Sequence, residues 1–235
     1  MPMTPPTDEA APRPAATILL LRRERGEASV LMGQRGAAAA FMPSKYVFPG
    51  GGVDAEDGSI PLAGGLAETC LARLDQRADP GFGATLAAAA VRELWEETGL
   101  ILGDRSPWPG PAPEGWQGFA ALGYRPSAAA LRFFFRAITP PGRSRRFDAR
   151  FFLADAARLA VDPDDFSGAS DELSHLHWVP ISEARRLNLP FITEVVLAEL
   201  SDLLAGLTET DPLPVPPSVP FFDNSGPVPT FRRLI

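Results

Sequence analysis

The sequence AAVRELWEETGLIL, residues 89–102, places three glutamates and one arginine inside an otherwise apolar run. Apolar residues recur there and just upstream at spacings of three and four, which predicts a helix over 84–98. Gly99 follows as a typical helix stop signal. The predicted helix therefore carries a charged cluster beside an apolar stripe.

The three glutamates share one side of this helix. At 3.6 residues per turn, Glu93, Glu96 and Glu97 fall within roughly 100° of arc. Like charges four residues apart destabilise a helix, and the macrodipole disfavours anions near its C-terminal end. A hard divalent cation removes this conflict, because it needs several oxygen ligands on one side. A solvated acidic helix face is the alternative interpretation.

The rest of the chain predicts a single layered α/β domain. Short runs rich in branched and aromatic residues predict strands at 16–23, 29–35, 46–54, 145–156 and 173–181. Two helices are expected over 182–189 and 190–207, and a loop over 103–116. Residues 126–138 are expected to be helical after their proline, with a strand as the alternative because of three consecutive phenylalanines. This order of strands, glycine turn, helix, strands and terminal helices suits one α/β fold.

Composition restricts the class of protein. The chain has 235 residues, 45% of them hydrophobic, which is enough for one domain with a full core. A net charge of −7 argues against broad binding to nucleic acid, which needs a basic surface. Cys70 is the only cysteine, which excludes an intrachain disulfide. With no signal-peptide pattern and no run of about 20 apolar residues, we expect no membrane partner and a cytoplasmic location.

The segment RELWEETGL, residues 92–100, matches the second half of the Nudix box, G-x5-E-x7-R-E-U-x-E-E-x-G-U, where U is aliphatic. Seven fixed positions of the motif fall within these nine residues. The chain therefore resembles the Nudix hydrolases. The resemblance implies an α/β/α sandwich built around a mixed β-sheet.

The first half of the box resembles a segment further upstream. FPGGGVDAEDG, residues 48–58, is similar to the PGG turn that precedes the helix in this family. If Gly51 is the box glycine, Asp57 takes the position of the first box glutamate. Thirty-four residues then separate Asp57 from Arg92, where the box has seven, so about 27 are inserted. Residues 58–83 supply this insertion, in which LAETCLARLDQ predicts a short helix.

An interrupted box is typical of one subgroup, the coenzyme A-type Nudix proteins related to a peroxisomal mammalian enzyme. Residues 39–51, AAFMPSKYVFPGG, resemble the phrase that precedes the insertion in that subgroup. The resemblance covers the Nudix hydrolase domain, residues 15–205. Proline-rich composition predicts a disordered or extended arm at 1–14 and a proline-rich tail at 206–235. We expect the tail to pack in an extended form, if it packs.

The resemblance also implies roles for individual residues. Mg²⁺ or Mn²⁺ would be held by Glu93, Glu96 and Glu97, helped by the carbonyl of Gly51. Arg92 would orient the glutamates through a salt bridge. Asp57, one methylene shorter than glutamate, is expected to be a structural carboxylate rather than a ligand.

Four further residues are candidates outside the box. Glu172 is the candidate general base, because many Nudix enzymes draw a catalytic acid from a late loop; Asp171 competes with it. Arg35 and Lys45 are candidate phosphate contacts, with plain surface charge as the alternative.

The hypothesis is a metal-dependent hydrolase of a diphosphate linkage, with coenzyme A or an acyl derivative as a candidate substrate and a homodimer as a candidate assembly. Two alternatives stay open. One is a non-catalytic Nudix-fold sensor that binds a nucleotide. The other is a hydrolase of ADP-ribose, NADH or nucleoside triphosphates.

Overall fold

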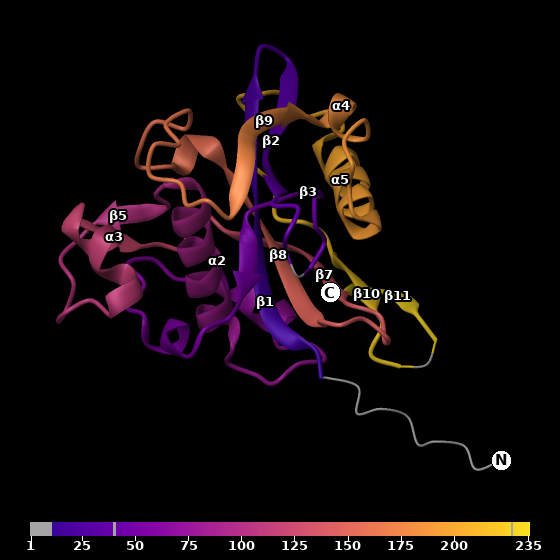
Figure 1. Ribbon diagram of the computed structural model, residues 1–235, viewed down its shortest axis with the longest axis horizontal. Coiled ribbons are helices and arrows are strands. Elements are labelled where there is room, and N and C mark those ends of the chain that lie inside the picture. Colours follow the sequence, from indigo (N-terminus) through magenta and orange to yellow (C-terminus); the bar gives the residue numbers. More distant parts are fainter. Residues whose placement is uncertain (1–10, 40, 227) are drawn as a thin grey trace.

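The computed structural model describes residues 11–39, 41–226 and 228–235, so most of the expected arm, 1–14, lies outside the described residues. A nine-stranded mixed sheet separates two helical layers (Figure 1). Its strands are β1 (Arg13–Glu24), β2 (Glu27–Arg35), β3 (Tyr46–Val47), β4 (Gly50–Gly52), β7 (Arg132–Ile138), β8 (Phe147–Asp155), β9 (Leu173–Pro180), β10 (Val219–Asp223) and β11 (Thr230–Leu234).

The other elements are short, apart from two helices. They are η1 (Ala55–Ser59), α1 (Glu68–Leu74), α2 (Gly83–Thr98), the two-stranded sheet of β5 (Gly103–Arg105) and β6 (Tyr124–Pro126), η2 (Glu114–Trp116), α3 (Gln117–Ala121), η3 (Ala156–Arg158), α4 (Ile181–Ala184) and α5 (Phe191–Leu204). In Figure 1, α2 and α3 lie on one side of the sheet and α4 and α5 on the other. The predicted α/β/α sandwich is confirmed.

The strand order is β11-β10-β7-β8-β1-β2-β3, with β4 paired to β1 and β9 paired to β2. β1 pairs with β8, and β7 with β10, in parallel, whereas the other pairs are antiparallel. A hairpin joins β1 to β2 through Arg25 and Gly26, both at positive φ. Two consecutive left-handed residues form the turn whose twist matches that of the strands.

Two apolar clusters fill the space between the layers. Successive residues of β1 alternate between them: Ile18 and Leu20 face the α2 cluster, whereas Leu19 and Leu21 face the α5 cluster. All four are fully buried, because both faces of a central strand are covered. The sheet therefore holds α2 rigidly over β1, where it also contacts β4.

The helix α2 matches its prediction and ends as expected. Gly99 adopts φ 75°, and its N–H donates to the carbonyl of Trp95. A Cβ at this glycine would lie 2.9 Å from the backbone of Gly168. Both the left-handed conformation and the close approach of another segment therefore require glycine here.

Three expected elements differ from the structure. The helix expected within 126–138 is wrong: after β6, residues Arg132–Ile138 form the strand β7, as the alternative had it. All three phenylalanines are buried, because β7 is an interior strand covered on both faces and its register shifts between Phe133 and Phe135. The loop expected over 103–116 contains β5 and η2, and the helix expected over 182–189 is a single turn, α4.

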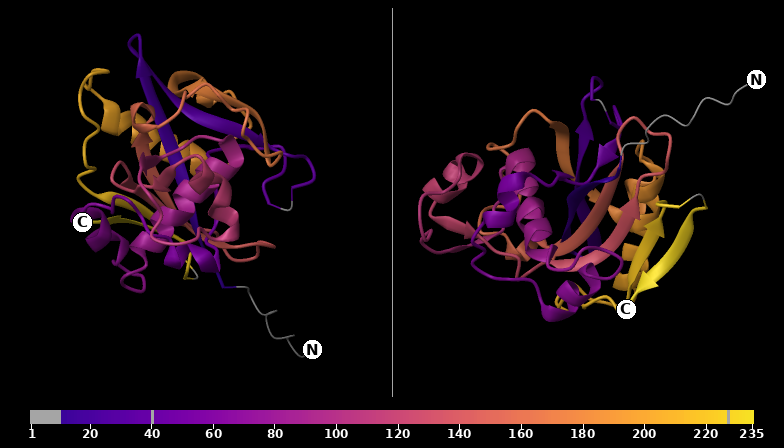
Figure 2. Two further views of the ribbon diagram at one scale, coloured as in Figure 1. Left: turned by 90° about the vertical axis from the view of Figure 1, so that its left-hand side faces the viewer. Right: turned by 90° about the horizontal axis from the view of Figure 1, so that it is seen from below.

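The C-terminal tail packs as an extended hairpin. β10 pairs with β7, and β11 forms the outer edge of the sheet (Figures 1 and 2). The guanidinium of Arg73 in α1 donates to the carbonyls of Pro216 and Pro217. The segment 58–83 and the tail are thus bonded to each other. In the described part of the chain, no helix is long and apolar enough to cross a membrane.

The tail contributes a large side chain to the core, which provides a test of its packing. Phe221 is 1% exposed and lies under the guanidinium of Arg136, whereas Phe231 on the same hairpin is 49% exposed. Phe221→Ala should lower the free energy of unfolding by about 3 to 5 kcal/mol. Phe231→Ala is the matched control and should cost about 1 kcal/mol or less. Equal losses in denaturant unfolding would show that the hairpin is not part of the core.

Candidate active site

Arg92 is the centre of the charged face of α2. Its Nε and Nη2 each donate to an oxygen of Asp57, at 3.0 Å, and Nη2 also donates to the carbonyl of Gly52 at 2.8 Å. Its Nη1 donates to Glu93 and to Glu96, both at 3.0 Å. One buried guanidinium therefore joins α2 to the segment that follows β4.

Asp57 is the structural carboxylate that its position predicts. Its side chain has no exposed surface, and one of its oxygens also accepts the N–H of Asp54 at 2.8 Å, which closes the 3-10 turn η1. Although Asp57 and Arg92 are 35 positions apart in the sequence, they are paired in space. The intervening residues 58–83 therefore leave the site and return to it.

The glycine turn lies against the same glutamates. Gly50 donates its N–H to Glu97 at 2.8 Å. A Cβ at Gly51 would lie 2.5 Å from Oε1 of Glu93, so only glycine allows this approach. β4 is held there by its pairing with Ala15–Thr17 of β1. The two halves of the motif thus meet across β4 and α2.

The carboxylates carry more negative charge than the protein neutralises. Arg92 faces four of them, on Asp54, Asp57, Glu93 and Glu96. Burial raises the pKa of Glu93 to about 7, against the lowering effect of Arg92. Burial, followed by the charge of Glu93, raises the pKa of Glu97 to about 8. Burial also raises the pKa of Glu96.

The pKa of Arg92 is raised, although burial alone would lower it. Burial lowers it, but the hydrogen bond to Asp57 and the neighbouring carboxylates raise it overall. Arg92 therefore stays charged.

The charges of Glu172 and Arg35 act on the buried glutamates. Glu172 is exposed, in the loop before β9, and its charge contributes to the raised pKa values of Glu93 and Glu97. Arg35, at the end of β2, acts in the opposite direction on the pKa of Glu97. Among the described residues, the buried Nε of Arg35 has no hydrogen-bond acceptor. Arg35 thus has a donor to spare near the glutamates.

The backbone of Lys45 lies next to that of Arg35, but the side chain of Lys45 is hydrogen-bonded to a different segment. The N–H of Arg35 donates to the carbonyl of Lys45. The ammonium of Lys45 donates to Asn188 at 2.6 Å and to the carbonyl of Leu189 at 3.0 Å. These bonds fix Lys45 to the segment between α4 and α5. Its role as a phosphate contact stays a prediction.

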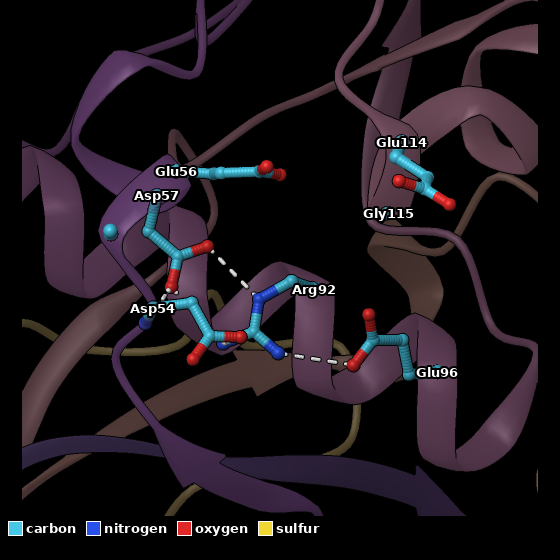
Figure 3. Close-up of a pocket in the computed structure, with 8 residues that line it drawn as sticks. Asp54, Glu56, Asp57, Arg92, Glu96, Glu114 and Gly115 are labelled. Carbon is cyan, nitrogen blue, oxygen red and sulfur yellow. Dashed lines mark hydrogen bonds and ion pairs between the residues drawn. The ribbon is translucent and has the colours of Figure 1, made fainter.

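A shallow hollow of about 380 Å³ adjoins Glu96. In Figure 3, Asp54, Glu56 and Asp57 come from one wall, Glu114 and Gly115 from the opposite wall, and Arg92 and Glu96 from α2 between them. Sequence reasoning missed Glu114 and Gly115, because they lie in an irregular segment rich in proline, glycine and tryptophan with no motif of its own. It also missed the backbone groups of Gly50 and Gly52.

A divalent cation fits the chemistry of these donors. Within the described ranges, no three histidine, cysteine, aspartate or glutamate side chains are already gathered at metal-binding positions. Instead, Glu93 and Glu96 turn to Arg92. The donor set nevertheless consists of oxygens only, and Glu93 and Glu97 are 8% and 2% exposed with too little positive charge nearby. Such a set suits Mg²⁺ or Mn²⁺.

Comparison with known proteins identifies the family of the chain. The family model described as the NUDIX domain matches residues 11–200. The chain belongs to the Nudix family. A Caenorhabditis elegans protein named nudix hydrolase 7 is 30% identical over 183 residues, which are 73% of this chain and 52% of that protein. The chain thus spans about half the length of this curated relative.

Solved structures give the same fold. A NUDIX hydrolase from Alicyclobacillus acidocaldarius is 23% identical and has a TM-score of 0.60, with 86% of this chain and 99% of that chain covered. At this identity the likeness concerns the fold alone. Nudix hydrolases in general use divalent metal ions.

The ion pair between Asp57 and Arg92 can be tested through stability. Asp57→Asn removes one buried charge and leaves the guanidinium with a poorer partner, so it should lower the free energy of unfolding by about 3 kcal/mol. Glu56→Gln changes the exposed neighbour and should alter it by less than about 0.5 kcal/mol. Urea unfolding measures both. Similar values for the two variants would refute the structural role of Asp57.

The raised pKa values predict how stability depends on pH without metal. Because the folded state holds protons on Glu93 and Glu97 more tightly than the unfolded state, their contribution is fully present below about pH 4.5. It is lost as the pH rises through about 7 and about 8. The melting temperature in EDTA should therefore fall over this window.

Glu97→Gln provides the control for this pH dependence, because it removes one of the two titrating groups. The fall in melting temperature should be shallower in this variant. Mg²⁺ should raise the melting temperature of the unmodified protein more at pH 8.5 than at pH 6, since bound metal requires ionised ligands. A melting temperature that rises with pH in EDTA would contradict the described charge balance.

Proposed function

We propose that the chain is a metal-dependent hydrolase that cleaves the diphosphate linkage of a nucleoside diphosphate-linked substrate. The observation that carries this proposal is the pairing of Asp57 with Arg92, which brings the glycine-rich segment 48–58 to the glutamates of α2. The under-neutralised glutamates of α2 supply the donors that a divalent ion requires.

In this proposal Glu93, Glu96 and Glu97 hold Mg²⁺ or Mn²⁺ together with the carbonyl of Gly51. A bound divalent ion would neutralise the diphosphate and lower the pKa of a bound water. Arg92 keeps Glu93 and Glu96 oriented through its two bonds of 3.0 Å. Phosphoryl transfer requires mainly such positioning and charge neutralisation from the protein.

The residues around the glutamates take the remaining roles. Glu172 accepts the proton of the attacking water, whose oxygen forms a bond to phosphorus while the anhydride P–O bond breaks. The leaving phosphate departs as an anion. Arg35, with its spare donor, contacts a phosphate oxygen of the substrate. Lys45 contacts the substrate only if it releases Asn188.

We further propose that residues 58–83 are an insertion within the Nudix box and that coenzyme A or an acyl derivative is the substrate. Support comes from the resemblance of residues 39–51 to the coenzyme A-type subgroup and from the return of the chain to Arg92 after the insertion. The catalytic geometry itself is compatible with other nucleoside diphosphate-linked compounds.

A substrate screen tests the activity and the substrate together. The chain should be incubated with Mg²⁺ or Mn²⁺ and with coenzyme A, ADP-ribose, NADH or nucleoside triphosphates, and the products identified by mass spectrometry. Coenzyme A should yield two phosphate-bearing fragments. Hydrolysis of another compound instead of coenzyme A would refute the proposed substrate but support the proposed hydrolase activity. Tight Mn²⁺-dependent nucleotide binding without turnover would instead identify a sensor.

The proposed ligands can be tested one by one. Glu96→Gln or Glu97→Gln should abolish Mg²⁺-dependent hydrolysis with the fold intact, because each removes a charged oxygen donor from the site. Glu194→Gln on the exposed face of α5 is the matched control and should keep full activity. Circular dichroism confirms the fold of each variant. Undiminished activity in both site variants would refute the assigned metal site.

A further inference from the structure

A β-bulge interrupts β9 immediately after the loop that carries Glu172. Met32 of β2 pairs with His177 and Gln34 pairs with Ser174, so two residues of β9, His175 and Leu176, lie opposite Gly33 alone. Bulges of this kind bend a strand and re-aim its side chains, and they are common next to active sites.

The backbone of the bulge is strained. His175 has φ 53°, in the left-handed region that favours glycine. Its side chain is exposed, and among the described residues the ring has a hydrogen bond only with the neighbouring Ser174 hydroxyl. Surrounding structure must therefore hold the bulge in place, because the residue itself does not favour this conformation.

Gly33 provides the space that the bulge needs. A Cβ at Gly33 would lie 2.8 Å from Cβ of Leu173 and 2.9 Å from Cδ2 of Leu176. Leu173 is 3% exposed and pairs with Arg35. Any side chain at position 33 would therefore push the start of β9 away from β2.

The other end of the loop is fixed on α2. Ser170 donates its N–H to the carbonyl of Glu96 at 3.0 Å. The backbone of Gly168 packs against Gly99, where a Cβ would lie only 2.9 Å away. Glu172 thus lies two residues after Ser170, which is bonded to α2, and one residue before Leu173, which pairs with Arg35 of β2.

We infer that Gly33 and the bulge of β9 are a positioning device that sets the carboxylate of Glu172 beside Glu93 and Glu97. Gly33 touches neither substrate nor metal; it acts through Leu173 and Leu176, which determine where β9 begins. This inference rests on the proposed function, in which Glu172 is the general base. The alternative is that the bulge merely ends the strand pairing and has no effect on catalysis.

The first test compares Gly33→Ala with Gly36→Ala, whose added Cβ would meet nothing within 4 Å. Misplacement of a catalytic group by about 1 Å can cost about 100-fold in rate, so Gly33→Ala should lower kcat by about tenfold or more with little change in KM. Gly36→Ala should leave kcat unchanged. An unchanged kcat in Gly33→Ala would overturn the inference.

A double-mutant cycle shows whether Gly33 acts through Glu172. Glu172→Gln alone should lower kcat by about 100-fold. Gly33→Ala should cause no further loss in that background, because there is no base left to misplace. An equal further loss would show that Gly33 acts elsewhere and would overturn the inference. Full activity of Glu172→Gln would refute the role of Glu172 as the general base. It would also refute the positioning role of Gly33.

A measurement on the metal-free protein separates the two proposals. Hydrogen exchange of the amides of residues 168–176 should become faster in Gly33→Ala and stay unchanged in Gly36→Ala. Unchanged exchange in both variants would overturn the positioning inference, whatever the activity. Faster exchange in a chain that hydrolyses no diphosphate would support the positioning of the loop and refute the proposed function.

A second pair of variants covers the case in which Gly33→Ala does not fold. His175→Val places a β-branched residue at φ 53°, which it strongly disfavours, whereas His175→Gly allows the same conformation. His175→Val should lower kcat and speed the exchange of residues 168–176, and His175→Gly should do neither. Equal behaviour of the two variants would overturn the inference.

Discussion

The buried pairing of Arg92 with Asp57 is the interaction on which the site depends. It joins two segments that lie 35 positions apart in the sequence, and it does so with a carboxylate that has no exposed surface. The same guanidinium orients Glu93 and Glu96. Removing either partner would leave a buried group without its main partner, which weakens the junction of the two segments.

The clustered carboxylates of the site destabilise the helix α2 that carries most of them. Four carboxylates surround one arginine, and Glu93 and Glu97 are held with pKa values of about 7 and about 8 because burial disfavours their charge. A structural role alone does not require such an arrangement, since fewer acids would pack better. A bound cation removes the conflict, which is why the charge imbalance supports a metal-dependent function. The apolar layers on both faces of the sheet supply the stability that this helix lacks.

Local patterns in the sequence were sufficient for α2 and α5, because periodicity determines these elements. The expectation that Asp57 is a structural carboxylate came instead from the resemblance to the Nudix box. Local patterns failed at 126–138. The strand β7 forms there because the layers on both faces of the sheet bury Phe133–Phe135. Contacts between distant segments also escaped prediction: Gly33 against Leu173, Gly99 against Gly168, and Glu114 beside Glu96. None of these has a signal within its own stretch of sequence.

The most direct test of the central claim is a crystal structure of the chain grown with Mn²⁺, recorded with anomalous scattering. The account predicts an anomalous peak between α2 and β4, with oxygens of Glu93, Glu97 and the Gly51 carbonyl at about 2.2 Å, near the distances of Mg²⁺ and Ca²⁺ ligands. Glu96 should have turned from Arg92 toward the ion. A peak elsewhere, or none at this position at millimolar Mn²⁺, would contradict the claim that these carboxylates form a metal centre.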